Sequence, residues 1–363
     1  MVQYLKPFHK KESQMNNSTS NSKKETKKLG IILTVCVLVL IFIAILLIKT
    51  LASAPAGAPQ IQYIELLAKE GITLQEAESI LTGAGINYEI IPTQSRTPNR
   101  VEKIEYMGKV EEGKTLIEVG TTVKLHANKV ENNKIIYLTF DDGPIVKYTD
   151  STLEKIYYNT GEMLDVLDSY GIKASFFLAG YQMVKPDRSQ YVSDIYSRGH
   201  LIACHSYSHD YDNIYNSTPD LLSDIERFEN ELNSLLGEEI CNSMGKYIRF
   251  PGGTNNSYLN EQQRMEFITA VRESGYKIYD WTLLINDADD RERLEGESDR
   301  DYYFRSLKNG LEAKKDSGKP LILLMHDTYS TKNVLPELLD YLISEGFYFD
   351  TIDNCSEYTF VEN

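Results

Sequence analysis

Cysteine and tryptophan are scarce in this chain of 363 residues, which holds 4 cysteines and 1 tryptophan. Cys36 lies inside a long apolar run, and the other three, Cys204, Cys241 and Cys355, form no C-x-x-C pair. An odd number of cysteines without regular spacing excludes a disulfide framework as the basis of the fold. Cys204 ends a short apolar run, so we expect its side chain to be buried in a strand.

Positive charge is also in short supply. The chain carries 38 basic and 53 acidic residues, and 30 basic and 51 acidic residues remain after position 49, a net charge of −21. A surface with this excess of negative charge repels phosphate backbones. We therefore expect no nucleic-acid partner.

One apolar run, residues 29–48, extends over twenty positions without a charge, which is enough for a helix to cross a bilayer. Seven lysines in residues 1–28 predict a disordered cytoplasmic tail, a transmembrane anchor over residues 29–49 and an extracellular location for the rest. Residues 50–59 are rich in Ala and Pro and are typical of an extended linker. Because residues 52–54 resemble a signal-peptidase site, a cleaved signal and a secreted protein are the alternative.

Two adjacent carboxylates, Asp141 and Asp142, follow an apolar run (135–140) that is typical of a buried β-strand and that Gly143 and Pro144 end. Adjacent acids repel each other and need a compensating partner. A metal ion bound by one carboxylate, with the other acting as a base, would provide it. A solvated turn is the alternative, because Asp, Gly and Pro are common turn residues.

A second polar cluster holds His205 and His209, four residues apart after another apolar run (200–204). Two imidazoles at this spacing converge if the loop curls like a helical turn. Two histidines and one aspartate leave coordination positions open for water and substrate, which is typical of a catalytic metal site.

The pattern of the remaining segments indicates an α/β fold. Strand-like runs at 247–250, 277–281 and 321–327 alternate with helix-like segments at 162–170, 190–198, 219–236, 262–274, 301–316 and 334–345. Such alternation predicts a parallel sheet. Each polar cluster directly follows a strand, and in α/β barrels the residues after the strands gather at one face.

Five ordered motifs resemble those of the polysaccharide deacetylase family, also called NodB-like or carbohydrate esterase family four. They are T-F-D-D-G-P at 139–144, H-S-Y-S-H at 205–209, R-F-P-G-G at 249–253, a divergent stretch at 280–287 and L-M-H-D at 324–327. The resemblance covers about residues 133–360, and the expected deacetylase domain spans residues 133–363. It implies a distorted (β/α) barrel and metal-dependent removal of N- or O-acetyl groups from glycans.

The resemblance also implies roles for single residues. Asp142, His205 and His209 would bind a divalent ion, Zn²⁺ or alternatively Co²⁺ or Ni²⁺, which polarises the acetamide carbonyl and lowers the pKa of bound water. Asp141 would accept the proton of that water, and His326 would protonate the leaving amine.

Arg249 is expected to pair with an acid of the fourth motif and so hold Asp141 in place, with an ordinary structural ion pair as the alternative. Asp287 is the chosen partner, and Asp280 is also possible. Ser206 is expected to stabilise its loop rather than act as a nucleophile, because no base and orienting group surround it.

Pro251, Gly252, Trp281 and Leu324 are the candidate substrate-binding residues. Gly252 stands where the family often has an aromatic residue; it keeps the backbone N–H that would stabilise the oxyanion, but a wall of the groove is lost. Trp281 would line the acetyl pocket or belong to the core.

Residues 60–128 are expected to form a small separate α+β module. Thr73 and Glu76 form a capping-box pattern that begins a helix, and strand-like runs follow at 88–91, 101–106 and 121–126. The pattern resembles a PASTA domain, which implies contact with peptidoglycan; a spacer between membrane and enzyme is the alternative.

These observations predict a membrane-anchored extracellular deacetylase whose partner is cell-wall polysaccharide and whose substrate is the N-acetylglucosamine of peptidoglycan. A catalytically silent wall-binding or sensing protein is the alternative from another class. Among enzymes, chitin-like oligomers, N-acetylmuramic acid and acetylxylan remain alternative substrates.

Overall fold

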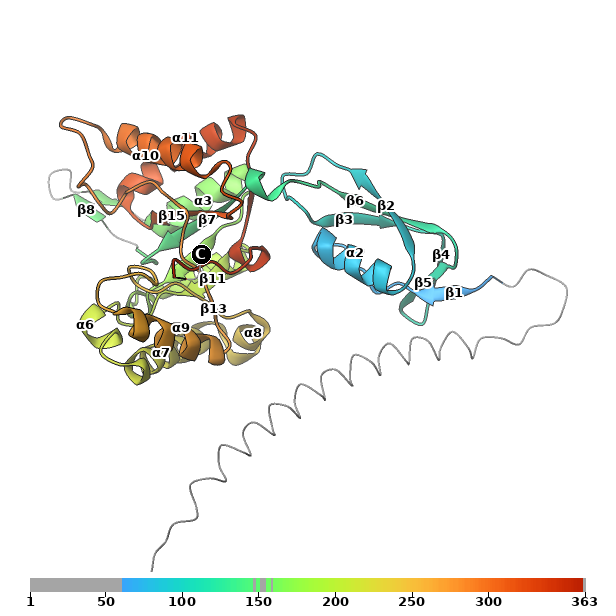
Figure 1. The fold of residues 1–363 in the computed structure, drawn as a ribbon, viewed down its shortest axis with the longest axis horizontal. Helices are drawn as coiled ribbons and strands as arrows, with labels where there is room; N and C mark the ends of the chain where they lie inside the picture. Colours follow the sequence, from blue (N-terminus) through green and yellow to red (C-terminus); the bar gives the residue numbers. More distant parts are fainter. Residues whose placement is uncertain (1–60, 146–147, 151–154, 158, 362–363) are drawn as a thin grey trace, which may run out of the picture. The chain divides into compact units, whose positions relative to one another are not determined.

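The computed structural model describes residues 61–145, 148–150, 155–157 and 159–361 (Figure 1). The predicted tail, anchor and linker all fall outside these residues. No helix in the described ranges is long and apolar enough to cross a membrane. Contacts divide the chain into two units. The first consists of the residues up to Leu66 together with Met107–Thr121, and the second consists of Leu67–Tyr106 and Thr122–Asn363.

The first unit contains a three-stranded antiparallel sheet that the sequence pattern did not predict. Its order is β1 (Tyr63–Glu65), β5 (Lys114–Glu118) and β4 (Gly108–Glu111). Gly108 allows the close pairing of β4 with β5, because a Cβ atom there would lie 1.9 Å from the main-chain oxygen of Leu116.

The second unit begins with the predicted helix, α2 (Leu74–Gly83), whose capping box between Thr73 and Glu76 is present. Strand β6 (Thr122–Ala127) pairs in parallel with β2 (Asn87–Pro92) and antiparallel with β3 (Val101–Glu105). The predicted helix and three strands are therefore confirmed. Their resemblance to a PASTA domain stays a prediction.

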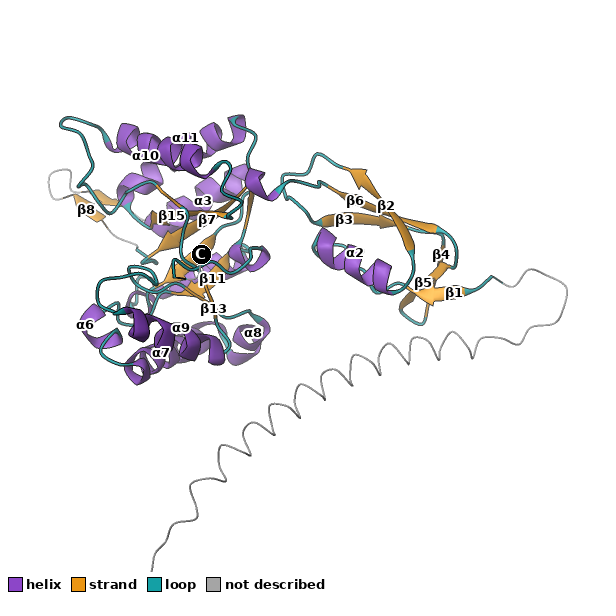
Figure 2. Ribbon diagram, in the orientation of Figure 1, coloured by secondary structure: helices purple, strands orange, loops and turns teal. Residues whose placement is uncertain are grey.

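The same unit contains a curled, all-parallel sheet of eight strands (Figure 2). Its hydrogen-bonded order is β13 (Lys277–Ile278), β12 (Tyr247–Ile248), β11 (Leu201–Cys204), β10 (Ser175–Leu178), β7 (Ile135–Asp141), β15 (Leu321–His326) and β14 (Leu283–Leu284), and β16 (Tyr348–Asp350) also pairs with β7. Within the described residues the order runs from β13 to β14 without closing. The sheet is thus a half-open version of the predicted barrel.

Helices surround this sheet and confirm the predicted alternation. They are α3 (Asn159–Tyr170), α4 (Gly180–Met183), α5 (Ser189–Ser197), α6 (Tyr211–Ile214), α7 (Thr218–Leu236), α8 (Glu238–Ser243), α9 (Glu261–Glu273), α10 (Asp299–Lys314) and α11 (Tyr329–Ser344). A short antiparallel pair, β8 (Tyr148–Asp150) and β9 (Lys155–Tyr157), precedes α3. The sequence pattern missed β10, β14 and β16, each of which has only two to four residues.

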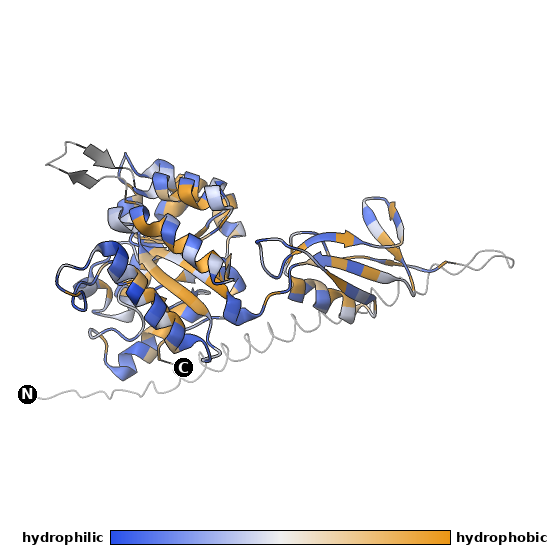
Figure 3. Ribbon diagram, turned by 90° about the horizontal axis from the view of Figure 1, so that it is seen from above, coloured by the Kyte–Doolittle hydropathy of each residue, from blue (hydrophilic) through white to orange (hydrophobic). Residues whose placement is uncertain are grey.

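Strand β7 has a different core on each of its faces, and hydrophobic residues are concentrated on the central strands (Figure 3). Ile136, Leu138 and Phe140 pack in the core that the helices cover, whereas Ile135 and Tyr137 pack in a second core inside the curled sheet. Side chains alternate along a strand, so Thr139 and Asp141 also project inward. Because of this alternation, the Asp141 side chain lies on the inner face of the sheet, at the carboxyl end of β7.

Candidate active site

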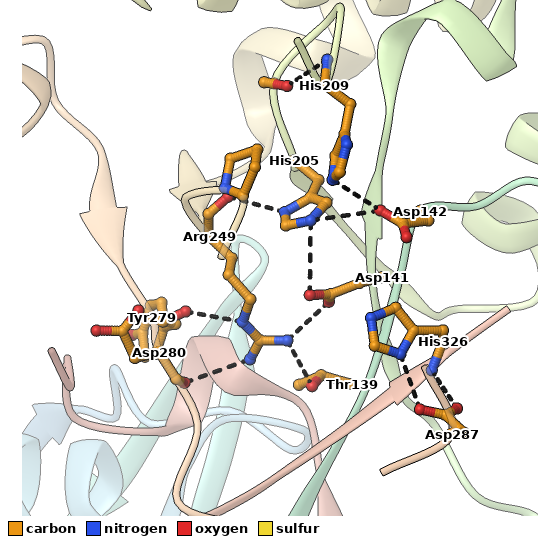
Figure 4. A network of polar contacts seen from close by, with 12 residues as sticks. Thr139, Asp141, Asp142, His205, His209, Arg249, Tyr279, Asp280, Asp287 and His326 are labelled. Carbon is orange, nitrogen blue, oxygen red and sulfur yellow. Dashed lines mark hydrogen bonds and ion pairs between the residues drawn. The ribbon is translucent and has the colours of Figure 1, made fainter. Parts of the chain in front are cut away.

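Three side chains from two strand ends converge at the carboxyl edge of the sheet (Figure 4). Asp142 follows β7, and His205 and His209 follow β11; single ligand atoms of all three lie within 4.8 Å of one another. Nε2 of His209 is 3.2 Å and Nε2 of His205 is 3.5 Å from Oδ1 of Asp142. The structure therefore brings together the three residues predicted as metal ligands.

Hydrogen bonds from the surrounding loops fix the orientation of both histidines. Nδ1 of His205 lies 2.9 Å from the main-chain oxygen of Arg249. Since a carbonyl can only accept, Nδ1 carries a proton, and Nε2 is the ring nitrogen available to a metal ion. The main-chain N–H of His209 donates to Oγ of Ser206 at 3.0 Å, which confirms that Ser206 stabilises the loop.

Backbone strain is concentrated in these loops. Six described non-glycine residues have positive φ, and four of them are Asp142, Ser206, His209 and Asn286. The left-handed conformation costs such residues about 1 kcal/mol or more each. Strain gathered beside one cluster of side chains indicates that their positions serve a function.

The electrostatics of the cluster suit a cation. Burial alone raises the pKa of Asp142, but the imidazoles of His209 and His205 outweigh it and hold that pKa below the usual range. Burial also lowers the pKa of His205, which favours the neutral imidazole. Oδ1 of Asp142 is buried without a hydrogen-bond partner. Burial also lowers the pKa of His209, but the hydrogen bond and charge of Asp142 outweigh it and raise that pKa. An imidazole nitrogen without its proton and an unsatisfied carboxylate oxygen are suitable ligands for a divalent transition-metal ion, so these residues fit one.

Asp141 lies beside the cluster and is held by Arg249. The Arg249 side chain is completely buried, and its Nη1 donates to Oδ1 of Asp141 at 2.7 Å and to the hydroxyl of Thr139 at 2.8 Å. Oδ2 of Asp141 faces His205, 3.7 Å from its Nε2. Sequence reasoning missed Thr139, although its position two residues before Asp141 on the same strand placed both on one face.

The predicted pairing of Arg249 with an acid of the fourth motif is wrong in its detail. The guanidinium instead donates to two main-chain oxygens, from Nε to Tyr279 at 2.9 Å and from Nη2 to Asp280 at 3.3 Å. The carboxylate of Asp280 is occupied elsewhere, since it accepts from the main-chain N–H groups of Thr254 and Phe360. Carbonyls at the carboxyl end of β13 thus replace the expected carboxylate.

Asp287, the chosen partner of Arg249, pairs with His326 instead. Its Oδ1 lies 2.8 Å from Nδ1 of His326, and its Oδ2 accepts the main-chain N–H of His326 at 2.7 Å. Burial lowers the pKa of His326, but the hydrogen bond and charge of Asp287, with smaller contributions from Asp141 and Asp142, raise it to about 9. The imidazole is therefore a proton donor at neutral pH, with Nε2 free.

Asp327, the residue after His326, faces away from it. Its Oδ2 accepts from the main-chain N–H of Ile145 at 3.1 Å and from the hydroxyl of Thr160. Burial raises the pKa of Asp327 to about 6. Asp327 thus anchors the loop that follows Asp142.

The four predicted substrate-binding residues differ in exposure. Pro251 is buried and its carbonyl accepts the Tyr215 hydroxyl at 2.6 Å, whereas Gly252 is exposed with a φ of +75°. Leu324 is nearly buried on β15, two residues before His326. Trp281 is half-buried, and its ring packs edge-on against Phe360 at 4.9 Å.

Comparisons with known proteins agree with this site. Residues 128–270 match the model of the polysaccharide deacetylase family; His326 and Asp287 lie beyond the match. The chain is 24% identical over 272 residues to a peptidoglycan-N-acetylglucosamine deacetylase of Bacillus cereus, covering 74% of this chain and 88% of the relative. It is 27% identical over 252 residues to a chitin deacetylase of Pestalotiopsis sp., covering 68% and 70%.

A solved structure gives a similar result. The catalytic domain of peptidoglycan N-acetylglucosamine deacetylase from Eubacterium rectale aligns with a TM-score of 0.51 at 27% identity, over 63% of this chain and 94% of that chain. The motifs, the curled parallel sheet and these matches coincide on one domain. Over residues 128–270, the chain therefore contains a polysaccharide deacetylase domain.

Proposed function

We propose that this protein is a metal-dependent deacetylase that hydrolyses the acetamide of N-acetylglucosamine in peptidoglycan. The observation that carries the proposal is the arrangement of three groups at one sheet edge: a candidate metal site (Asp142, His205 and His209), a carboxylate held by Arg249, and a histidine held by Asp287. Amide hydrolysis needs an activated water, a base and an acid, and the three groups match these needs.

Asp142, His205 and His209 would hold the ion, with Zn²⁺ proposed and Co²⁺ or Ni²⁺ as alternatives. When bound, such an ion polarises a carbonyl and acidifies water. Asp141 has one oxygen fixed by Arg249, so its Oδ2 is available to accept the proton of the attacking water. His326 donates the proton from Nε2 to the departing amine, because Nδ1 is committed to Asp287.

No nucleophilic side chain is needed. The Ser206 hydroxyl is buried and accepts the His209 N–H. Among the described residues, no hydrogen bond joins it to a base that would activate it. Direct attack by water is therefore the proposed route. The N–H of Gly252, an exposed residue, is the proposed donor to the oxyanion.

The named relatives support peptidoglycan as the substrate, since two of those described above are peptidoglycan N-acetylglucosamine deacetylases. The chitin deacetylase among the relatives keeps chitin-like oligomers as an alternative. N-acetylmuramic acid and acetylxylan are further alternatives.

We further propose that residues 29–49 anchor the protein, with residues 1–28 in the cytoplasm and residues 50–59, 60–128 and 133–363 outside. Support comes from the uncharged run at 29–48 and the lysines before it. The full chain should then stay in the membrane fraction at its full mass. Recovery of a soluble form that starts near Pro55 would instead identify a cleaved signal.

Acetate release tests the proposed activity. The full chain, loaded with zinc, is incubated with peptidoglycan, chitin oligomers and acetylxylan, and the His205→Ala variant is the control. We expect acetate from peptidoglycan, and none from the control. A zinc-loaded chain that binds peptidoglycan but releases no acetate from any substrate would establish the alternative of a silent wall-binding protein.

A further inference from the structure

Helix α7 buries one acidic side chain among its apolar residues. The side chains that α7 turns toward the core are Leu221, Asp224, Ile225, Phe228 and Leu232. The other four are apolar and follow the spacing of a helix that packs on a core. Asp224 is only 7% exposed, and a buried carboxylate destabilises the fold unless hydrogen bonds or an opposite charge compensate it. The groups that bind Asp224 therefore indicate why an acid is present at this position.

Main-chain N–H groups of the loop between His205 and His209 bind Asp224. Its Oδ1 accepts from the N–H of Tyr207, and its Oδ2 accepts from the N–H of Ser208 at 3.0 Å. Hydrogen bonds to an ionised acceptor are stronger than those between neutral groups. The two bonds compensate the buried charge, and they tie α7 directly to the segment that joins the two histidines.

The carbonyl groups of the same loop are bound by a different element. In α4, the N–H of Gly180 donates to the Ser206 carbonyl at 3.0 Å, and the N–H of Tyr181 donates to the Tyr207 carbonyl at 2.8 Å. Each of the two peptide units between positions 206 and 208 is therefore held at both ends, its carbonyl by α4 and its N–H by Asp224. Because a peptide unit is planar, fixing both ends also fixes its rotation.

Helix α7 also holds the side chain of Tyr207. Cζ of Arg227, one turn after Asp224, lies 3.7 Å from the centroid of the Tyr207 ring, which is favourable for a cation over an aromatic face. On α4, a Cβ atom at Gly180 would lie 2.4 Å from Cδ2 of Tyr207, so the ring packs where a larger residue would clash. The middle of the loop is thus fixed through its backbone and its side chain.

We propose that Asp224 is a positioning residue for the candidate metal site and that it sets the affinity for the ion by fixing the loop in which His205 and His209 converge. The loop needs external contacts, because Ser206 and His209 have φ values of +62° and +53°, which are unfavourable for residues with a side chain. Without the carboxylate, the two peptide units could rotate, and the imidazoles would be held less firmly within reach of one ion. The inference rests on the proposed function and adds a residue that is not itself one of the three proposed ligands.

The zinc affinity of the full chain, measured by competition with a chelator of known affinity, tests this role. We expect Asp224→Asn to bind zinc at least about tenfold more weakly than the parent, since partners that orient metal ligands typically contribute about 10–100-fold. The amide keeps the size of the side chain but removes the charge and one acceptor. The visible spectrum of bound Co²⁺ should also change, because it depends on ligand geometry, which a residue that only stabilised the fold would leave unaltered. Glu226→Gln, which replaces an exposed acid of the same helix, is the matched control and should keep the parent's affinity and spectrum.

A second measurement needs no variant and decides the question if Asp224→Asn does not fold. In the metal-free parent, the amide hydrogens of Tyr207 and Ser208 should be protected from exchange with solvent. Exchange of both at the rate of an unstructured chain would overturn the proposal, and so would a folded Asp224→Asn with the zinc affinity and cobalt spectrum of the parent.

The outcomes separate this inference from the proposed activity. Parental zinc affinity in Asp224→Asn, together with acetate release by the parent, would overturn the positioning role and uphold the deacetylase. Weaker zinc binding by Asp224→Asn, in a chain whose parent releases no acetate from any substrate, would uphold the positioning role and refute the deacetylase.

Discussion

Asp287 binds His326 through both of its carboxylate oxygens, one on the main-chain N–H and one on Nδ1 of the ring. The two contacts fix the backbone at the end of β15 and the plane of the imidazole together. They leave Nε2 as the only ring nitrogen that can exchange a proton with a substrate. Asp287 is therefore a positioning residue for the proposed acid.

Replacing Asp287 with Asn should lower the pKa of His326 from about 9 toward its ordinary 6.5. The imidazolium form would then be lost at a lower pH, so the alkaline limb of the plot of kcat against pH should shift to lower pH. For stability, a pKa raised on folding stabilises the native state fully below pH 6.5, and this contribution is lost as pH rises through about 9. NMR titration of the His326 ring measures the change in its pKa, and a pH–rate profile measures the shift of the alkaline limb.

The matched control is Asp289→Asn, which removes an acid two residues away that pairs with Arg291 at the surface. It should leave the His326 titration unchanged. An unchanged His326 pKa in Asp287→Asn would refute the positioning role.

His326→Ala should keep zinc but lower kcat on N-acetyl substrates by about 10² or more, the usual contribution of a general acid. An amine leaves poorly until it is protonated, whereas a phenolate leaves without a proton. The loss on a phenyl acetate ester should therefore be much smaller. An equal loss on both substrates, with zinc retained, would exclude His326 as the acid.

Metal content should divide the site residues into two groups. His205→Ala, His209→Ala and Asp142→Asn should lose zinc, because each removes one of three converging ligands. Asp141→Asn should retain zinc and lose about 10²–10⁴ in turnover, the usual effect of removing a general base. Elemental analysis of the purified variants gives the stoichiometry.

His200→Ala is the control for loss of a histidine, since its buried ring binds the Ala174 N–H outside the site. It should keep the zinc of the parent. If Asp141→Asn and Asp142→Asn lost zinc equally, the division between base and ligand would be wrong.

Tyr215→Phe should lower kcat with little effect on KM. The C=O and N–H of a trans peptide point in opposite directions, so the Tyr215 hydroxyl on the Pro251 carbonyl also orients the N–H of Gly252. Removal of an oxyanion donor costs about 10²–10³ in kcat, and since this donor is loosened rather than lost we expect about tenfold. Steady-state kinetics on the amide substrate measure it, and a rise in KM at constant kcat would contradict the role.

The positions of the metal-site residues could be predicted because strand ends in a parallel sheet meet at one edge. Asp142 and His205 follow apolar runs, at 135–140 and 200–204, that the sequence pattern identified as strands. The partner of His326 could not be predicted in this way. Asp287 follows β14, which has two residues, and is turned toward β15 by Asn286 with a φ of +63°. A turn of this kind leaves no periodic signal in the sequence.

The partners of Arg249 were hidden for a different reason. Its side chain donates to the main-chain oxygens of Tyr279 and Asp280, the two residues after β13. Every residue type has a main-chain oxygen, so the sequence cannot indicate such an acceptor. Strand β10 was missed because its short run, Ser175–Leu178, has no alternation that would distinguish a strand from a buried helix segment.

The ion pair of Arg249 with Asp141 contributes both to the proposed chemistry and to the stability of the fold. The guanidinium has no exposed surface, and removing the charge opposite a buried ion typically costs about 3–5 kcal/mol, a large share of the roughly 5–15 kcal/mol that holds a domain folded. A variant that lost Asp141 would keep its stability only if Arg249 were replaced as well. Relatives that have lost the activity but still fold should therefore differ from this chain at positions 141 and 249 together. The residues at these two positions would then indicate whether a relative is an active enzyme.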